Sequence, residues 1–313
     1  MSDKSAIEWT DASWNPVTGC TKVSQGCKNC YAERAWPRLQ HLPAHTGRAF
    51  TDVRCHPERL EQPLRWTKPR RIFVNSMSDL FHEDVPDEFI LSVFDVIRQC
   101  QNGYAPGPDK LTAWHTFQIL TKRPERMRDF CTRLRFSNKL YLSPSASPGF
   151  NPMTSLRNTW LGVSVEDQAT ADERIPLLLQ TPAAVRWISA EPLLGPVNLR
   201  HHLGLTNNHD DLRGLLNWVV CGGESGPKAR SMHPDWVRSL RDQCQTSGVP
   251  FFFKQWGEYS PVGAGNPSRY IHPSKPNDGL WHKDADGVIP VWRIGKKAAG
   301  RMLDGREWNE YPA

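Results

Sequence analysis

Three cysteines near the N-terminus have the type and the spacing to bind one metal centre. Cys20, Cys27 and Cys30 follow the pattern C-x6-C-x2-C within eleven residues. The chain begins Met-Ser-Asp-Lys with no apolar signal segment, so we expect a cytoplasmic protein. In that reducing compartment clustered thiols indicate metal binding or redox chemistry rather than disulfides.

Zinc and an iron–sulfur cluster are the two candidates for this cysteine loop. A structural zinc site takes four ligands, usually as two pairs, and the nearest complement to the single C-x2-C pair is Cys55-His56. A [4Fe–4S] cluster is normally held by four thiolates, so three would leave one iron open to a substrate or cofactor. The lack of an obvious fourth ligand favours the cluster, and zinc stays open as the alternative.

Short apolar runs of the chain must position this loop. Each run ends in a polar cluster, and most are followed by a helical stretch. The runs cover residues 6–9, 71–75, 115–121, 159–165, 185–190, 217–221 and 249–253. Helical periods follow at 86–98, 124–134 and 234–246, with another through 177–179 that Pro176 should kink. This alternation predicts an α/β fold, a partial or closed (β/α) barrel of six to seven parallel strands with long loop insertions.

Polar residues gather where the predicted strands end. In barrels the chemistry lies on the loops at the carboxyl ends of the strands, so we expect these residues to share a pocket. They are Ser76, Asp79, Lys122, Arg123, Glu166, Asp167, Ser189, Glu191, Gly222 to Ser225, Lys254 and Gln255.

Composition is compatible with a sizeable core and with an anionic partner. Of the 313 residues 38% are hydrophobic and 23% charged, and the formal net charge is +6. No run of about 18 apolar residues predicts a membrane span. The chain contains no phosphate-binding loop of the Gly-x-x-x-x-Gly-Lys type and no Gly-x-Ser-x-Gly elbow, so nucleotide and serine hydrolysis have no support.

We expect two parts in the chain. Residues 1–258 should form the barrel, with the cluster loop at 14–34, and residues 259–313 a C-terminal extension packed on it. The stretches 101–114, 141–158, 200–216 and 259–290 are rich in Gly, Pro, Asn or His and predict surface insertions or lids. The tail from Gly295 predicts a short basic helix followed by a turn.

Several motifs together resemble one group of enzymes. The cysteine loop followed by Tyr31-Ala-Glu resembles the cluster loop of radical S-adenosylmethionine enzymes, in particular the branch that contains the spore photoproduct lyases. Nearly the whole chain resembles a phage-associated family of three-Cys-motif, radical-SAM-like proteins. The matching segments begin at Trp14, Phe73, Leu120, Leu161, Ile188, Cys221, Phe252 and Leu303.

The resemblance implies a [4Fe–4S] cluster on Cys20, Cys27 and Cys30, and S-adenosylmethionine chelated to the fourth iron. Reductive cleavage, with an electron donor such as flavodoxin or ferredoxin, would give a 5′-deoxyadenosyl radical that abstracts a substrate hydrogen. By strand order the methionine contacts would be Ser76 and Asp79, and the ribose contacts Ser164 and Glu166. The remaining cofactor contacts would be Tyr31, Ser189, Gly222, Gly223 and Glu224, with Glu191 near the cofactor as a catalytic residue.

Cys221 invites a catalytic hypothesis, because a thiol at the mouth-facing end of a strand could return a hydrogen atom to a product radical. The alternative is a small buried core residue. Lys122, Arg123, Arg230 and Lys254 could face an anionic substrate, with Gln255 beside them and Trp256 stacking on a base. The alternative there is separate surface charges and a core tryptophan.

Two features depart from the usual radical SAM pattern. The first cysteine gap is six residues rather than three, with Asn29 where an aromatic usually precedes the last cysteine. The Gly222-Gly223-Glu224 motif follows the sixth run rather than the second. Despite these departures, the resemblance implies a radical SAM enzyme, and we expect it to act on a nucleic acid or nucleotide-derived substrate. A metal-stabilised nucleic-acid-binding protein without turnover, and a radical enzyme on a peptide or small metabolite, remain alternatives.

Overall fold

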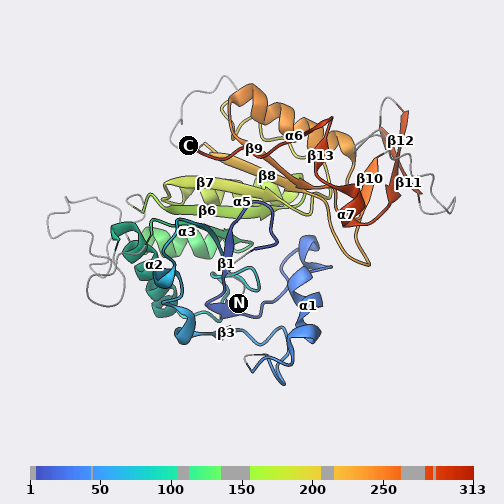
Figure 1. Cartoon of the computed structure of the whole chain (residues 1–313). Coiled ribbons are helices and arrows are strands. Elements are labelled where there is room, and N and C mark those ends of the chain that lie inside the picture. Colours follow the sequence, from blue (N-terminus) through green and yellow to red (C-terminus); the bar gives the residue numbers. More distant parts are fainter. Residues whose placement is uncertain are drawn as a thin grey trace. The chain divides into compact units, whose positions relative to one another are not determined.

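A computed structural model describes residues 5–43, 45–103, 113–134, 156–205, 215–261, 279–284 and 287–313, with only the backbone described for 279–289. The chain divides into two compact units, and Figure 1 labels many of their elements. The first unit comprises residues 1–23, 32–163 and 176–186, and the second comprises 24–31, 164–175 and 187–313. Neither unit is a continuous segment of the chain.

Seven strands form the main sheet, in the order β1-β4-β5-β6-β7-β8-β9. They are β1 (Ala12–Trp14), β4 (Arg71–Val74), β5 (Thr116–Thr121), β6 (Thr159–Val165), β7 (Val185–Ala190), β8 (Trp218–Gly222) and β9 (Phe251–Gln255). The predicted α/β class with six to seven parallel strands is confirmed. Because β1 and β9 are the two edges, the (β/α) barrel is partial rather than closed.

In the first unit the sheet is apolar because its strands are buried. Ile72 pairs with Phe117 and Val74 with Ile119, and all four side chains are fully buried. Helices α2 (Asp87–Asn102) and α3 (Pro124–Arg133) pack on each other through Phe130, whose ring stacks on a phenylalanine of α2 with centroids 5.9 Å apart. Each such buried side chain contributes about 1.5–3 kcal/mol through removal from water.

In the second unit α6 (Pro234–Ser247) packs against β8 and β9 (Figure 1). The helix starts at a proline, and the ring of His233 accepts a hydrogen bond from the amide of Asp235. It ends at Gly248, whose φ of 71° supplies the left-handed cap. The sequence predicted a helical stretch over 234–246, and this helix is confirmed.

Two predicted strands are displaced. The run at 6–9 forms a turn instead, and the first strand is β1 at Ala12–Trp14. Trp9 is buried in that turn, so its apolar character reflects burial and not a strand. The last run begins at 249, yet β9 starts at Phe251, after Pro250, which has no amide hydrogen to donate.

The remaining elements lie between and after these strands and helices. They are β2 (Val17–Thr18) paired with β3 (Arg54–Cys55), the 3-10 turns η1 (Gln25–Cys27), η2 (Pro57–Arg59) and η3 (Pro63–Arg65), and the helices α1 (Tyr31–Leu39), α5 (Gln168–Gln180) and α7 (Lys296–Ala299). The predicted kink position, Pro176, lies inside α5. Two further antiparallel sheets contain β10 (Tyr259–Pro261), β11 (Gly279–Asp284) and β12 (Gly287–Arg293), and then β13 (Met302–Leu303) and β14 (Arg306–Glu307).

The sequence predicted only an insertion at 259–290, and β10, β11 and β12 were not foreseen. The predicted basic helix and turn correspond to α7 and the β13–β14 hairpin. Much of each predicted insertion, namely 104–112, 141–155, 206–214, 262–278 and 285–286, lies outside the described residues.

Residues after β14 cover the edge of β9. The amide of Phe253 donates to the carbonyl of Trp308 at 2.9 Å, and Asn309 forms an antiparallel bridge with Phe252. The indole of Trp218 donates to the carbonyl of Glu310 at 2.8 Å. The end of the described chain therefore continues the sheet beyond its last named strand.

Candidate functional site

The three predicted metal ligands belong to different parts of the fold. Cys20 lies in the first unit, after β2, whereas Cys27 ends η1 and Cys30 precedes α1 in the second unit. All three are partly exposed, and none of the eight cysteines, all of which are described, forms a disulfide. We therefore describe the surroundings of the cysteines unit by unit.

In the second unit the cysteine loop rests on Glu166, directly after β6. Glu166 is fully buried, and its carboxylate accepts a hydrogen bond from the hydroxyl of Ser24 at 2.9 Å. Arg174 of α5 pairs with the same carboxylate at 3.2 Å and also donates to the carbonyl of Ser164 at 2.7 Å. A Cβ on Gly26 would lie 2.3 Å from the Glu166 carboxylate, so only glycine allows the loop to approach this closely.

Glu224, after β8, holds the loop at a second point. Its carboxylate accepts hydrogen bonds from Arg230 at 2.6 and 2.9 Å and from the side-chain amide of Asn29 at 3.0 Å. Arg230 also donates to the carbonyl of Gln25 at 3.0 Å. Burial alone would raise the pKa of Glu224, but the bonds from Arg230 and Asn29 outweigh it and hold the pKa below its ordinary value. Glu224 is thus an ionised anchor for the residues that flank Cys27 and Cys30.

A third carboxylate, Glu191, follows β7. The ammonium of Lys254 contacts its two oxygens at 2.7 and 2.9 Å, and the side-chain amide of Gln255 lies 3.4 Å away. Burial raises the pKa of the Tyr31 hydroxyl, and negative charge on Cys30 and Glu191 raises it further, although 49% of the tyrosine's surface is exposed. Glu191, Lys254 and Gln255, predicted separately, therefore form one cluster.

The amide oxygen of Gln255 is unusual in this cluster. Gln255 is 3% exposed, and its Oε1 has no hydrogen-bond partner among the described residues. A buried acceptor without a partner costs free energy, roughly 1–3 kcal/mol. A bound molecule with an N–H or O–H donor would satisfy it.

Packing accounts for one glycine of the Gly222-Gly223-Glu224 motif. A Cβ on Gly223 would lie 2.0 Å from the main-chain oxygen of Trp256, whereas a Cβ on Gly222 would meet nothing closer than 3.4 Å. Trp256 itself is 2% exposed, and its indole donates to the carbonyl of Met302 at 2.8 Å. This burial favours the core role for Trp256 over the predicted stacking on a substrate base.

Cys221 is fully buried in β8. Burial raises the pKa of its thiol well above the ordinary value, with smaller contributions from Glu191 and from Cys244 of α6. Cys244 is itself buried on the face of α6 that packs against the sheet. The full burial of the thiol favours the core alternative over a hydrogen-atom donor. Ser189, on β7, is likewise 2% exposed.

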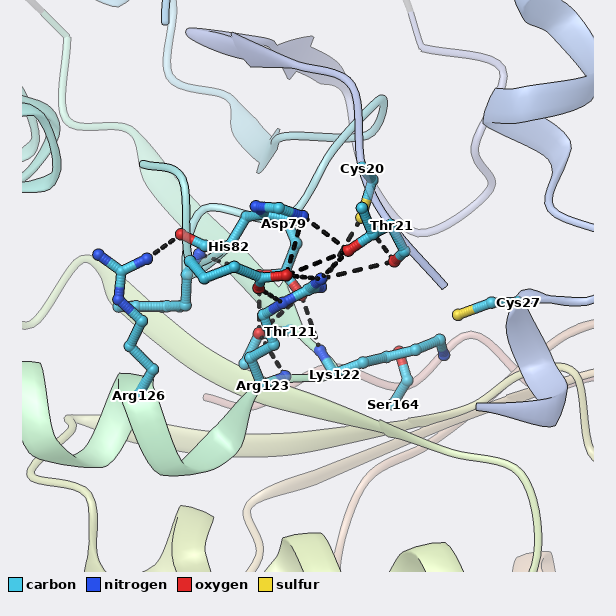
Figure 2. A network of polar contacts seen from close by, with 12 residues as sticks. Cys20, Thr21, Cys27, Asp79, His82, Thr121, Lys122, Arg123, Arg126 and Ser164 are labelled. Carbon is cyan, nitrogen blue, oxygen red and sulfur yellow. Dashed lines mark hydrogen bonds and ion pairs between the residues drawn. The ribbon is translucent and has the colours of Figure 1, made fainter. Parts of the chain in front are cut away.

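In the first unit three of the predicted residues after β4 and β5, Asp79, Lys122 and Arg123, belong to a single network (Figure 2). Asp79 accepts hydrogen bonds from the hydroxyl of Thr121 at 2.7 and 2.9 Å and from the amide of Lys122 at 3.0 Å. Arg126 donates to the carbonyl of His82 in the same network. Ser76 instead donates to the side chain of Asn15 at 3.1 Å. The Asp79 carboxylate is thus engaged in joining two strand-end loops.

Arg123 links this network to Cys20 (Figure 2). Its guanidinium contacts Glu83 at 2.7 Å, the hydroxyl of Thr21 at 2.7 Å and the sulfur of Cys20 at 3.7 Å. Burial lowers the pKa of Arg123, but Glu83, Asp79 and Cys20 together raise it above the ordinary value. The hydrogen bond from Arg123 lowers the pKa of Glu83 to about 2. Arg123 therefore has its charge matched within the fold.

The chemistry of the donor set fits an iron–sulfur cluster, since such clusters take thiolate ligands. The possible zinc partner fits poorly, because His56 is buried and both ring nitrogens are engaged. Nε2 lies 2.8 Å from the hydroxyl of Thr18, and Nδ1 lies 3.0 Å from the carboxylate of Glu58. In the described part of the chain no three His, Cys, Asp or Glu side chains are already grouped as a metal site.

Several residues that build these surroundings were not predicted. They are Thr21, Ser24, Asn29, His82, Glu83, Thr121 and Arg174. Ser24 and Asn29 could have been suspected, because they are polar and lie beside the cysteines. Arg174 carries no such signal, because it lies in the middle of a helix.

No helix among the described residues is long and apolar enough to cross a membrane.

Comparison with solved structures finds spore photoproduct lyase twice. A point mutant of that enzyme matches with a TM-score of 0.35 and 10% identity, over 88% of this chain and 66% of the other. A double mutant with bound AdoMet and dinucleoside spore photoproduct matches with a TM-score of 0.34 and 10% identity, over 90% and 68%. The chain thus spans about two thirds of the length of these proteins, and likeness at this level carries no argument about activity.

No protein of curated function matches the chain. A family model matches residues 4–312, which is nearly the whole chain. The predicted phage association is not addressed by any of these comparisons and stays a prediction. The chain belongs to the family described as "Protein of unknown function (DUF5131)".

Proposed function

We propose that this chain is an iron–sulfur enzyme of the radical S-adenosylmethionine type, in which Cys20, Cys27 and Cys30 hold a [4Fe–4S] cluster. The spacing of the cysteines and the resemblance of their loop support this reading. The engagement of His56, the nearest candidate for a fourth zinc ligand, argues against zinc. We propose a nucleic acid or nucleotide-derived substrate.

The observation that carries the proposal is the docking of the cysteine loop on carboxylates that follow the strands. Ser24 is bound by Glu166 after β6, and Asn29 is bound by Glu224 after β8. In (β/α) barrels the loops at the carboxyl ends of the strands carry the chemistry. The docking of Ser24 and Asn29 on these carboxylates supports an active site at the neighbouring Cys27 and Cys30.

In this proposal the charged residues position the loop and the reactants. Glu166 and Glu224 have their charges matched by Arg174 and Arg230, so they orient the loop. The unpartnered oxygen of Gln255 accepts a hydrogen bond from the cofactor or the substrate. With S-adenosylmethionine, a cluster of this kind supplies radical chemistry that no side chain can supply.

Anaerobic reconstitution tests the proposal. The protein purified without oxygen should contain about four iron and four sulfide per chain. With dithionite and S-adenosylmethionine it should release 5′-deoxyadenosine, which is measured by chromatography and mass spectrometry. The variant with Cys20, Cys27 and Cys30 all changed to Ala is the control and should do neither. Stoichiometric zinc without iron, or a full cluster that yields no 5′-deoxyadenosine, would contradict the proposal.

A further inference from the structure

Three of the basic residues predicted to meet an anionic substrate are already paired with carboxylates. Arg123 contacts Glu83 and Asp79, and Arg230 contacts Glu224. Lys254 contacts Glu191 in the same way. A polyanion would have to displace these carboxylates, so other cations must be sought for that role.

Five cations of the second unit lie along a connected, exposed stretch beside the cysteine loop. We name this stretch the basic rim, and it consists of Lys28, Lys228, Arg293, Lys296 and Lys297, all of which are exposed. For Lys28, Lys228, Arg293 and Lys297, no ion pair with an acidic side chain is found among the described residues.

Hydrogen bonds and positions along the chain connect the members of the basic rim. The side chain of Asn29, next to Lys28, donates to the carbonyl of Lys228 at 2.8 Å. Arg293 donates to the carbonyls of Gly226 and Pro227 at 3.1 and 2.8 Å, so it lies against the loop that carries Lys228. Lys296 and Lys297 open α7, three and four residues after Arg293. The cations therefore follow one another along a single surface of this unit.

The acidic residues next to the rim do little to neutralise it. Glu224 is buried and bonded to Arg230 and Asn29. Glu258 accepts a hydrogen bond from the amide of Gly226 at 2.8 Å, which directs its carboxylate into the loop. The described side chains thus leave a net positive surface, and such a surface attracts phosphate groups through counterion release.

An exposed aromatic side chain accompanies these charges. Tyr31 follows Cys30, lies three residues after Lys28, and is 49% exposed. Cations along a backbone track together with an aromatic platform are the combination that binds single-stranded nucleic acids.

We infer that the basic rim binds the phosphate backbone of a single-stranded nucleic acid, with Tyr31 stacking on a base beside the cysteine loop. This inference rests on the proposed function, because it names the substrate class for that site. The residues that bind the substrate in this inference differ from those that the sequence suggested. The partner is therefore defined by its chemistry: it is a flexible polyanion that carries aromatic bases.

The test measures binding of fluorescein-labelled dT20 and rU20 to the full chain by anisotropy, across 50–300 mM salt. The rim variant combines Lys28→Gln, Lys228→Gln and Lys297→Gln, and the control combines Arg38→Gln, Arg54→Gln and Lys68→Gln, three exposed cations of the first unit. We expect the rim variant to bind roughly 10- to 100-fold more weakly at low salt, with its salt slope reduced by about two, and the control to bind like the parent.

Tyr31→Phe and Tyr31→Ser separate stacking from charge. Phenylalanine should retain binding, whereas serine should weaken it by roughly 5- to 100-fold with an unchanged salt slope. Equal losses in the rim and control variants would overturn the inference. Equally tight binding of polyglutamate, or of vesicles containing phosphatidylserine, would also overturn it.

Binding is measured without S-adenosylmethionine or reductant, so the two proposals fail separately. Rim-dependent binding with no 5′-deoxyadenosine in the reconstituted enzyme would leave the docking surface in place and remove the radical function. Formation of 5′-deoxyadenosine without rim-dependent binding would do the reverse.

Discussion

Glu224 has a structural role that its sequence motif did not indicate. The sequence predicted that Glu224 contacts a cofactor, yet its carboxylate accepts hydrogen bonds from Arg230 and from Asn29 of the cysteine loop. Glu166 makes an equivalent contact with Ser24. At the residue scale, the two glutamates are positioning residues for Cys27 and Cys30.

We expect Glu224→Gln to loosen the cysteine loop. The substitution removes the charge that matches Arg230 and weakens the bond from Asn29, so stability should fall by about 1–3 kcal/mol. In the protein without metal, Cys27 and Cys30 should react severalfold faster with N-ethylmaleimide, as mapped by peptide mass spectrometry. Glu173→Gln, an exposed carboxylate of the same unit, is the matched control. Unchanged reactivity in Glu224→Gln would contradict the anchoring role.

Acid should weaken the same contact. The folded pKa of Glu224 lies below its ordinary value of 4.5, so its ionised form stabilises the fold above about pH 4.5. That contribution is lost as the pH falls through the folded pKa. Urea unfolding between pH 3 and 7 should show the loss in the parent and a smaller loss in Glu224→Gln. Identical pH profiles would mean that this carboxylate does not contribute.

Among the elements, the turn after β8 is set by one close approach of two backbones. Gly223 lies against the main-chain oxygen of Trp256, so the loops after β8 and β9 meet without room for a side chain. Gly222, its neighbour in the motif, faces only ordinary contacts. The double glycine therefore has a packing cause at one position, whatever the other one binds.

Gly223→Ala should destabilise the protein by roughly 1–3 kcal/mol or more, because the added Cβ would overlap a backbone atom that cannot rotate away. Gly222→Ala should change stability by less than about 1 kcal/mol, since its nearest contact is ordinary van der Waals contact. Chemical denaturation of the two variants measures the difference. Equal stability of both would show that the backbone adjusts without cost.

The elements were predictable where one local pattern decides them. The runs at β4, β5, β6, β7 and β8 are apolar because buried parallel strands need apolar side chains on both faces. β1 is only three residues long, and the nearby apolar Trp9 led to a predicted strand at 6–9 instead of 12–14. β10, β11 and β12 pair within a stretch rich in Gly, Pro and Asn, where composition indicates loops.

On the scale of the whole molecule, the site depended on distances along the chain that no local pattern reports. Ser24 and Glu166 are 142 residues apart, and Asn29 and Glu224 are 195 apart. The sequence predicted which residues end the strands, and the structure brings Glu191, Lys254 and Gln255 together as expected. The sequence could not predict that Arg174 and Arg230 would pair with Glu166 and Glu224, because those pairings arise only from the fold.

The division into two units also escaped the sequence. Each unit consists of separate stretches of the chain. The first unit includes residues 176–186, although residues 164–175 before them belong to the second unit. Composition changes mark boundaries only between continuous domains, so no linker could be read here. A cut between residues 163 and 164 would leave both units incomplete.

The pairing of Asn309 with Phe252 has a consequence for how the protein behaves at high concentration. An exposed edge strand is a template on which a second chain can polymerise. Three aromatic residues in succession, Phe251, Phe252 and Phe253, would make β9 a strong template of this kind. The segment after β14 occupies that edge, so β9 cannot pair there with a second chain and aggregation through this edge is prevented.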